Sequence, residues 1–341
     1  MKLQDIPNDK ESFPFYKNKF REGSETRKKD MQKPPEPSGP AAARGASPKG
    51  AKQATCLITD MPILQMGRGG KHMADLIYEV KDHLARITLN RPEHLNCFSE
   101  EMIQLWAAAL EDIRDRDDVY VVLLSGNGKA FCAGGDVKAM AAGDGFFESN
   151  DDITSTALAR KNALWRGIQR IPLILEEIDK PVIAKMHGAA VGAGLDMALM
   201  CDIRIASESA SLSESYFNAG IVPGDGGAYF LPRLVGRDKA LDLFLTSRVL
   251  KGPEAERIGL VTHAVPDDRL NDYVEQYIRK LMDAPQQAMR LTKRAIDQGA
   301  QSSLRASLDL VSSFMGIVTE LDDYHTRTAA LAERLSKKSR R

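Results

Sequence analysis

The sequence lacks several features that would assign it to a familiar class of protein. Its 341 residues balance 47 Lys and Arg against 47 Asp and Glu, so no excess of positive charge points to nucleic acid or an anionic membrane surface. No apolar run approaches the length needed to cross a bilayer, and the opening MKLQDIPNDKESF has no apolar stretch typical of a secretory signal. We therefore expect neither a membrane protein nor a nucleic-acid-binding protein.

Cysteine is also scarce. The four cysteines, Cys56, Cys97, Cys132 and Cys201, form no C-x-x-C pair, so the spacing indicates neither a zinc site nor a disulfide framework. Isolated cysteines of this kind are usually reduced core residues, which favours a cytoplasmic location. The sequence therefore predicts no metal site.

Residues 1–72 differ in composition from the rest of the chain. They hold 8 of the 16 prolines and carry 14 Lys and Arg against 8 Asp and Glu. Stretches such as QKPPEPSGPAAARGASPKGAK have no helical or strand periodicity and cannot bury enough apolar surface to offset the entropy of ordering. We predict a disordered basic, Pro-rich leader, or an expression-derived extension with Met73 as the natural start, because GRGGKHM resembles a vector-encoded junction. A basic arm that contacts RNA or a protein partner is the alternative.

Residues 73–284 alternate between strand and helix patterns. LIYEV at 76–80 and the alternation of Ala85, Ile87 and Leu89 predict a β-hairpin. VYVVLLSG at 119–126 is a continuous apolar run, as expected of a strand that is covered on both faces. PVIAKMHG and DIRIA are two further strand candidates, each followed by sequence that can form a helix. This alternation predicts an α/β domain.

Helix signals separate these strands and dominate the end of the chain. Ser99 is a candidate N-cap, and Met102, Trp106, Leu110 and Ile113 follow at spacings that give one apolar helix face. Residues 285–341 have little strand character and predict a C-terminal helical region.

Four segments in a fixed order carry the most information about function. They are NRPEHLNCFS at 90–99, KAFCAGGDVKAM at 129–140, HGAAVGAGLDMALMCDIRIA at 187–206 and GIVPGDGGAYFLPRLVG at 220–236. Together they resemble the crotonase (enoyl-CoA hydratase/isomerase) superfamily over essentially the whole of residues 76–338. The resemblance implies a spiral of ββα turns with a C-terminal helical region, an acyl-coenzyme A substrate, and a homotrimer or hexamer. It implies no cofactor, since coenzyme A enters as part of the substrate.

The resemblance also assigns roles to the glycine-rich turns. A thioester carbonyl develops negative charge during such reactions, and two backbone N–H groups can stabilise it. By resemblance these donors are the N–H groups of Gly135, in CAGGD, and Ala193, in VGAGLD. The resemblance implies further contacts with coenzyme A and substrate at Asn96, Cys97, Phe98, Ala133, Asp136, Val137, Lys138 and Gly192.

The acid and base positions depart from the pattern of the hydratases. Hydratases of this family use two glutamates, which correspond here to Asp196 and Tyr216. Asp196 resembles the aspartate of dienoyl-CoA isomerases, which carry a second aspartate at the position of Gly224; this chain has Asp225 one residue later. A single well-placed carboxylate favours moving a proton over adding water, which calls for a base and an acid together.

Three functions remain open from the sequence. The first is an enoyl-CoA hydratase or isomerase in which Asp196 is the acid/base. The second is an acyl-CoA thioester hydrolase, or an enzyme like the aryl-CoA dehalogenases, in which Asp225 attacks the substrate or activates water. The third is an inactive crotonase-fold binding protein.

Overall fold

The computed structural model describes residues 73–142 and 156–339, which belong to one compact unit. Segment 1–72, with its predicted role as a leader, lies outside the described residues. The strands are β1 (Leu76–Lys81), β2 (Leu84–Leu89), β3 (Val121–Gly126), β4 (Val182–Met186), β5 (Ala189–Val191), β6 (Ile203–Ser207), β7 (Ser211–Ser213), β8 (Leu250–Lys251) and β9 (His263–Val265). The α-helices are α1 (Glu100–Asp115), α2 (Val137–Ala142), α3 (Thr156–Arg166), α4 (Arg170–Glu177), α5 (Ala193–Leu199), α6 (Gly227–Val235), α7 (Arg237–Thr246), α8 (Gly252–Arg257), α9 (Leu270–Met282), α10 (Gln286–Gly299), α11 (Leu304–Thr319) and α12 (Asp322–Ser339). Short 3₁₀ helices are η1 (Pro92–His94), η2 (Ser215–Ala219) and η3 (Asp267–Arg269).

The strands form two sheets. The larger has the order β1-β2-β3-β4-β6-β9, and all of its neighbours pair in parallel except β1 and β2. The smaller has the order β5-β7-β8. The chain passes from the larger sheet to the smaller at β4–β5 and at β6–β7, and returns at β5–β6 and at β8–β9. The α/β class predicted from the sequence is confirmed.

Local sequence explains the first elements. β1 and β2 form the predicted hairpin, and its two turn residues, Asp82 and His83, have φ of 49° and 66°. A two-residue turn whose backbone matches the twist of the strands requires positive φ at both positions. The predicted N-cap is also confirmed, because the Ser99 hydroxyl accepts the N–H of Met102 at 3.0 Å.

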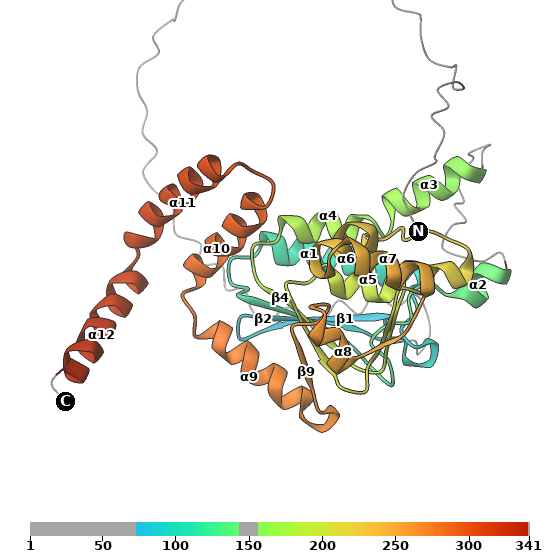
Figure 1. Ribbon diagram of the computed structural model, residues 1–341, viewed down its shortest axis with the longest axis horizontal. Helices are drawn as coiled ribbons and strands as arrows, with labels where there is room; N and C mark the ends of the chain where they lie inside the picture. Colours follow the sequence, from blue (N-terminus) through green and yellow to red (C-terminus); the bar gives the residue numbers. More distant parts are fainter. Residues whose placement is uncertain (1–72, 143–155, 340–341) are drawn as a thin grey trace, which may run out of the picture. The chain divides into compact units, whose positions relative to one another are not determined.

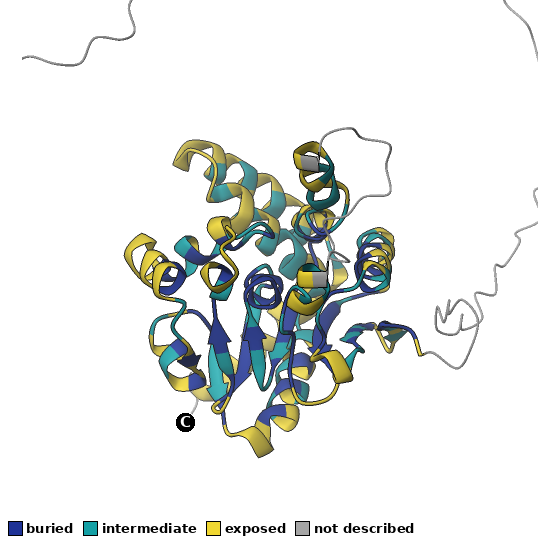
Figure 2. Ribbon diagram, turned by 90° about the vertical axis from the view of Figure 1, so that its right-hand side faces the viewer, coloured by how far each residue is buried: buried dark blue, intermediate teal, exposed yellow. Residues whose placement is uncertain are grey.

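Helices cover both faces of the larger sheet. Helices α1 and α4 to α7 lie on one face, while α9 lies on the other (Figure 1). Alternate residues of the strands separate the two cores: Ile87 and Leu124 pack toward α1, whereas Leu123 packs with α9 residues such as Val274. Dark strands between paler outer helix faces mark this burial in Figure 2. The four apolar residues predicted to line one face of α1 are all buried.

The C-terminal region is helical, as predicted, and it is attached to the α/β body by charged contacts. Arg290 in α10 reaches Asp179 at 2.9 Å, and Lys293 reaches Asp202 at 2.7 Å. Arg294 also pairs with Asp179, at 2.6 Å. None of the described helices has the length and apolar character that a membrane span requires.

Candidate active site

A cavity of about 1490 Å³ opens among the loops that follow the strands. Its wall is formed by the start of α1, the turn before α2, helices α3 and α4, the start of α5, and the segment from η2 to the start of α6. The volume exceeds that of most small-molecule pockets. A ligand with an extended body therefore fits this space.

Two of the glycine-rich turns are held together at the cavity wall. The N–H of Cys132 donates to Ala189 O, and the N–H of Val191 donates to Cys132 O, both at 3.0 Å. Glycine is required where the turns touch, because a Cβ on Gly194 would lie 2.3 Å from Cys132 O. Gly134, with φ of +82°, would likewise clash with Val191 O at 2.6 Å. Only glycine permits this close approach of two backbones.

This arrangement brings the two predicted donors to the same cavity. Gly135 and Ala193 both line it. In the part of the chain that the structure describes, no acceptor is found for the backbone N–H of either residue. Ala193 begins α5, where a helix has no internal acceptor for its first N–H groups. Two backbone donors are thus available to a ligand.

A cluster of acidic groups is centred on Tyr216, which lines the same cavity. Its hydroxyl contacts Asp196 Oδ2 at 2.5 Å and Asp225 Oδ2 at 3.2 Å. The backbone N–H of Gly227 also donates to Asp196 Oδ2, at 2.9 Å. A Cβ at Gly227 would lie only 2.1 Å from Asp196 Oδ1, so glycine at the start of α6 makes room for this carboxylate. The structure therefore brings together all three predicted acid/base residues.

The surroundings raise the pKa values of Asp196 and Asp225 toward neutral pH. Burial raises the pKa of Asp196 to about 7, opposed by the hydrogen bond from Tyr216 and reinforced by the charge of Asp225. Burial also raises the pKa of Asp225 to about 6, again opposed by Tyr216. A carboxyl with a pKa near the working pH can both accept and return a proton.

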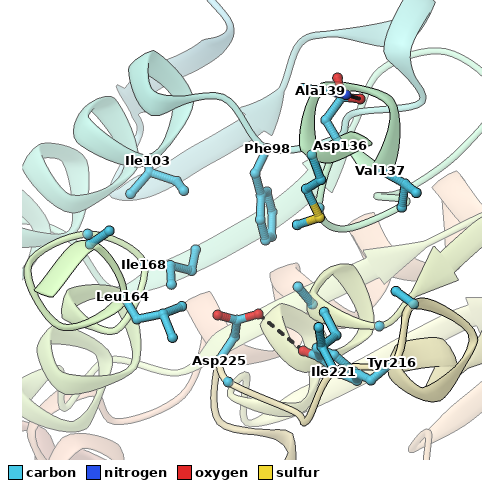
Figure 3. A pocket seen from close by; sticks show the side chains of 18 of the residues that line it. Phe98, Ile103, Asp136, Val137, Ala139, Leu164, Ile168, Tyr216, Ile221 and Asp225 are labelled. Carbon is cyan, nitrogen blue, oxygen red and sulfur yellow. Dashed lines mark hydrogen bonds between the residues drawn. The ribbon is translucent and has the colours of Figure 1, made fainter. Parts of the chain in front are cut away.

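The two aspartates differ in their access to the cavity. Asp225 and Tyr216 line it, and Figure 3 shows Asp225 near Tyr216 and Leu164, across the cavity from Phe98. Asp196 has no exposed surface and is absent from the cavity wall. The sequence favoured Asp196 as the group that meets the substrate, whereas the geometry places it one hydrogen bond behind Tyr216.

The predicted contacts with coenzyme A and substrate divide in a similar way. Five of them line the cavity: Phe98, Ala133, Asp136, Val137 and Gly192. Asn96, Cys97 and Lys138 do not. The Asn96 side chain is fully buried and organises the turn, since it accepts the N–H of Arg91 and donates to three backbone carbonyls.

Part of the apolar wall was not predicted from the sequence. Leu164, in α3, and Ile168, in the turn before α4, face the cavity. Their i, i+4 spacing was an available signal of one apolar face. Gln169 was also missed; its side-chain amide donates to Gly224 O at 2.7 Å and fixes the loop that carries Asp225. That contact links segments 55 residues apart, and no local pattern predicts it.

Comparisons with known proteins identify the family and the fold. The sequence profile of the enoyl-CoA hydratase/isomerase family matches residues 79–338. The 1,2-epoxyphenylacetyl-CoA isomerase of Escherichia coli (strain K12) is 32% identical over 263 residues, which cover 77% of this chain and 97% of the relative. The crystal structure of an enoyl-CoA hydratase from Bacillus anthracis has a TM-score of 0.68 and 30% identity, covering 76% of this chain and 96% of that chain. A Thermobifida fusca YX protein in complex with acetoacetyl-CoA has a TM-score of 0.64 and 30% identity, covering 73% of this chain and 96% of that chain.

Proposed function

The chain belongs to the enoyl-CoA hydratase/isomerase family, the crotonase superfamily, and we propose that it moves a proton within the acyl group of an enoyl-coenzyme A thioester. One observation carries this proposal. Two backbone N–H groups without an acceptor in the described residues, those of Gly135 and Ala193, share a cavity with the carboxyl of Asp225 and the hydroxyl of Tyr216. A thioester carbonyl on the donors leaves its acyl carbons facing an acid/base group.

The two donors act on the thioester oxygen. When the carbon next to the carbonyl loses a proton, negative charge moves onto that oxygen. Donors that are already in position cost no reorganisation as the charge forms, and each is typically worth about 2.7–4 kcal/mol in the transition state. Gly135 and Ala193 are held by the paired turns around Cys132, so they are preorganised for this task.

Asp225 is the group that takes and returns the proton in this proposal. Its carboxylate lines the cavity, and its pKa of about 6 leaves most of it ionised at neutral pH. It removes a proton from one carbon, the charge is held as an enolate on the thioester oxygen, and the same proton is returned two carbons along the chain. Tyr216 and Asp196 fix the carboxylate from behind. Isomerisation needs only this one cavity-facing carboxylate.

The decisive test compares Asp225→Asn with Asp196→Asn. Asparagine keeps the size of the side chain but cannot take a proton, so Asp225→Asn should lower kcat by about 10²–10⁴-fold with KM within a few-fold. Asp196→Asn should retain more activity, because it touches the substrate only through Tyr216. An active Asp225→Asn beside an inactive Asp196→Asn would return the acid/base role to Asp196, as the sequence suggested.

A second candidate is thioester hydrolysis, which the exposure of Asp225 to the cavity also supports. An ionised carboxylate there could attack the carbonyl or activate a water molecule. Mass spectrometry after incubation with straight-chain, branched and aromatic acyl-CoAs separates the reactions. An isomer keeps the substrate mass, a hydratase adds water, and a hydrolase incorporates heavy oxygen from labelled water into a free acid. Absence of turnover across the panel would leave a binding protein.

Charged side chains at the mouth of the cavity suit the nucleotide end of coenzyme A. Arg160 and Lys161 are exposed on α3, and both line the cavity. Their positive charge can meet the phosphates while the acyl group lies against Phe98 and Ile168. No further cofactor enters the proposal.

We also propose a homotrimer or hexamer. Helix α11 has half-buried residues on the face toward α10, yet its neighbouring stripe of Leu304, Leu308, Val311 and Met315 is exposed. An apolar stripe next to a packed face is typical of a surface that a second copy covers.

The free cysteines Cys97, Cys132 and Cys201 agree with a reducing, cytoplasmic location.

A further inference from the structure

Glu214 is a buried acid that the proposed proton transfer does not use. Its side chain is 1% exposed, and within the described residues neither of its carboxyl oxygens has a hydrogen-bond partner. Asp196 Oδ1 is unpartnered in the same way, although Asp196 Oδ2 accepts two hydrogen bonds. Buried polar atoms without partners are rare and costly, so three of them on two carboxyls require an explanation.

The backbone places these two carboxyls next to each other. Glu214 follows β7 directly, and the carbonyl of the preceding Ser213 accepts the N–H of Gly192 at 2.7 Å. Gly192 is the N-cap of α5, and its own carbonyl accepts the N–H of Asp196 at 3.0 Å. The segment that carries Glu214 therefore lies against the first turn of the helix that carries Asp196. One proton between the two carboxyls would give partners to Asp196 Oδ1 and to an oxygen of Glu214.

The charges around Glu214 agree with a retained proton. The titratable groups that act on it are Asp196 from α5, Asp225 from the loop before α6, and Tyr216 from η2. All three are acidic, and within the described ranges none of the groups acting on Glu214 is cationic. Burial, followed by the charge of Asp196, raises the pKa of Glu214 well above its usual range. A hydrogen bond from Glu214 has the opposite effect on Asp196, where it opposes the rise in pKa that burial causes.

We propose that Glu214 is a positioning residue that stays protonated at neutral pH and donates its O–H to Asp196 Oδ1. As the pH rises above about 7, Asp196 is then an ionised acceptor and holds the hydroxyl proton of Tyr216. Tyr216 has one proton to donate, and its contact with Asp196 is shorter than its contact with Asp225, 2.5 Å against 3.2 Å. Asp225 therefore receives the weaker hydrogen bond and remains the stronger base. The proposal rests on the proposed role of Asp225 in the reaction. It includes no covalent step, since the Glu214 proton stays in place through the catalytic cycle.

Removing the O–H of Glu214 should lower the pKa of Asp225, through the hydrogen bonds that join Glu214 to Asp196 and Asp196 to Tyr216. Without the Glu214 proton, Asp196 Oδ1 is unpaired and Asp196 itself takes a proton. The hydroxyl of Tyr216 is then free to donate to Asp225, and the negative charge of Asp196 is lost. Both effects favour the ionised form of Asp225, lower its pKa and weaken it as a base.

Two substitutions of similar size separate this role from simple packing. Glu214→Gln can still donate, through its amide N–H, to Asp196 Oδ1, whereas Glu214→Met cannot. We expect Glu214→Met to lose roughly tenfold or more in kcat, to keep KM within about threefold, and to move the acid limb of the pH–rate profile to lower pH. Glu214→Gln should restore kcat to within about threefold of the wild type and return the acid limb to its original position. Equal losses in both variants, or an acid limb that does not move in Glu214→Met, would overturn the proposal.

A measurement of the protonation state needs no turnover. At about pH 8, above the pKa values of Asp196 and Asp225, infrared spectroscopy of the wild-type protein should detect the carbonyl stretch of a protonated, buried carboxylic acid that shifts in D₂O. The band should disappear in Glu214→Gln and persist in Asp225→Asn. A missing band, or a band that is unchanged in Glu214→Gln, overturns the proposal. This test does not depend on whether Glu214→Met folds. If instead the band behaves as expected while Asp225→Asn stays active, the proposed reaction fails and the shared proton stands.

Discussion

The α/β body and the C-terminal helices differ in what covers their apolar side chains. In the body, Trp106 on α1 is 1% exposed and packs edge-on against Phe98, within a core that the chain closes by itself. In α11, Leu308 and Met315 are 59% and 53% exposed, and α10 and α11 contain no buried residue. All described residues of α12 are exposed as well. The body thus buries its apolar side chains within the single chain, whereas the C-terminal helices leave theirs exposed.

The attachment of the helices sharpens this difference. Asp179 is almost fully buried at the end of α4 and pairs with both Arg290 and Arg294 of α10. Removing either arginine would leave a buried carboxylate less well compensated, so these ion pairs hold α10 in place. Helix α10 is therefore oriented on the body by charge, whereas the α11 stripe stays exposed in the single chain.

The largest expected effect is on the stability of the body. Trp106→Ala removes a fully buried side chain and should lower the free energy of unfolding by about 3–5 kcal/mol. Leu308→Ala, the matched truncation in α11, should change it by less than about 0.5 kcal/mol at protein concentrations low enough to keep the chain monomeric. Denaturant titrations of both variants at two protein concentrations measure these changes in the free energy of unfolding. Similar losses in the two would mean that α11 is part of the same core.

A smaller effect, on catalysis alone, is expected at the wall of the cavity. Proline fits the first position of a helix but has no N–H, so Ala193→Pro should remove one oxyanion donor without breaking α5. The loss in kcat should correspond to about 2.7–4 kcal/mol, while Ala193→Gly, which keeps the N–H, should lose little. Kinetics with thermal melting as the folding control give the answer. If both variants lose the same activity, the backbone donor at Ala193 has no role.

Much of the body was predictable from the sequence, and the exceptions have physical reasons. The hairpin at Asp82–His83 and the Ser99 cap depend on neighbouring residues, so local patterns predicted them. The placement of Asp196 behind Tyr216 depends on contacts across 20 residues, and motif position alone does not reveal which carboxyl faces a cavity. The turn held by Asn96 is similar, because its three donated hydrogen bonds reach residues more than 30 positions away.

Assembly should respond to changes in the exposed stripe of α11. Leu308→Glu combined with Met315→Glu places two charges on this stripe and should weaken association at least tenfold, or about 1.4 kcal/mol, because buried unpaired charge is costly. Ala306→Glu with Ser313→Glu adds the same charge at the same spacing on another exposed face of the helix. Light scattering over a concentration series should detect smaller particles only for the first pair. An unchanged particle mass in the Leu308 and Met315 variant would mean that the interface lies elsewhere on the protein.

The smallest effect is expected from removing residues 1–72, which contrast with the body in composition rather than in burial. Their prolines and excess of positive charge give them little apolar surface to contribute to a core, and the body already closes around residues such as Leu76 and Ile87. A chain that starts at Met73 should therefore unfold within about 0.5 kcal/mol of the full chain and keep its kcat. Thermal melting and turnover, measured on both chains at equal concentration, provide the test. A midpoint several degrees lower, or a lost activity, would mean that the segment packs on the body, and the predicted boundary at residue 72 would be wrong.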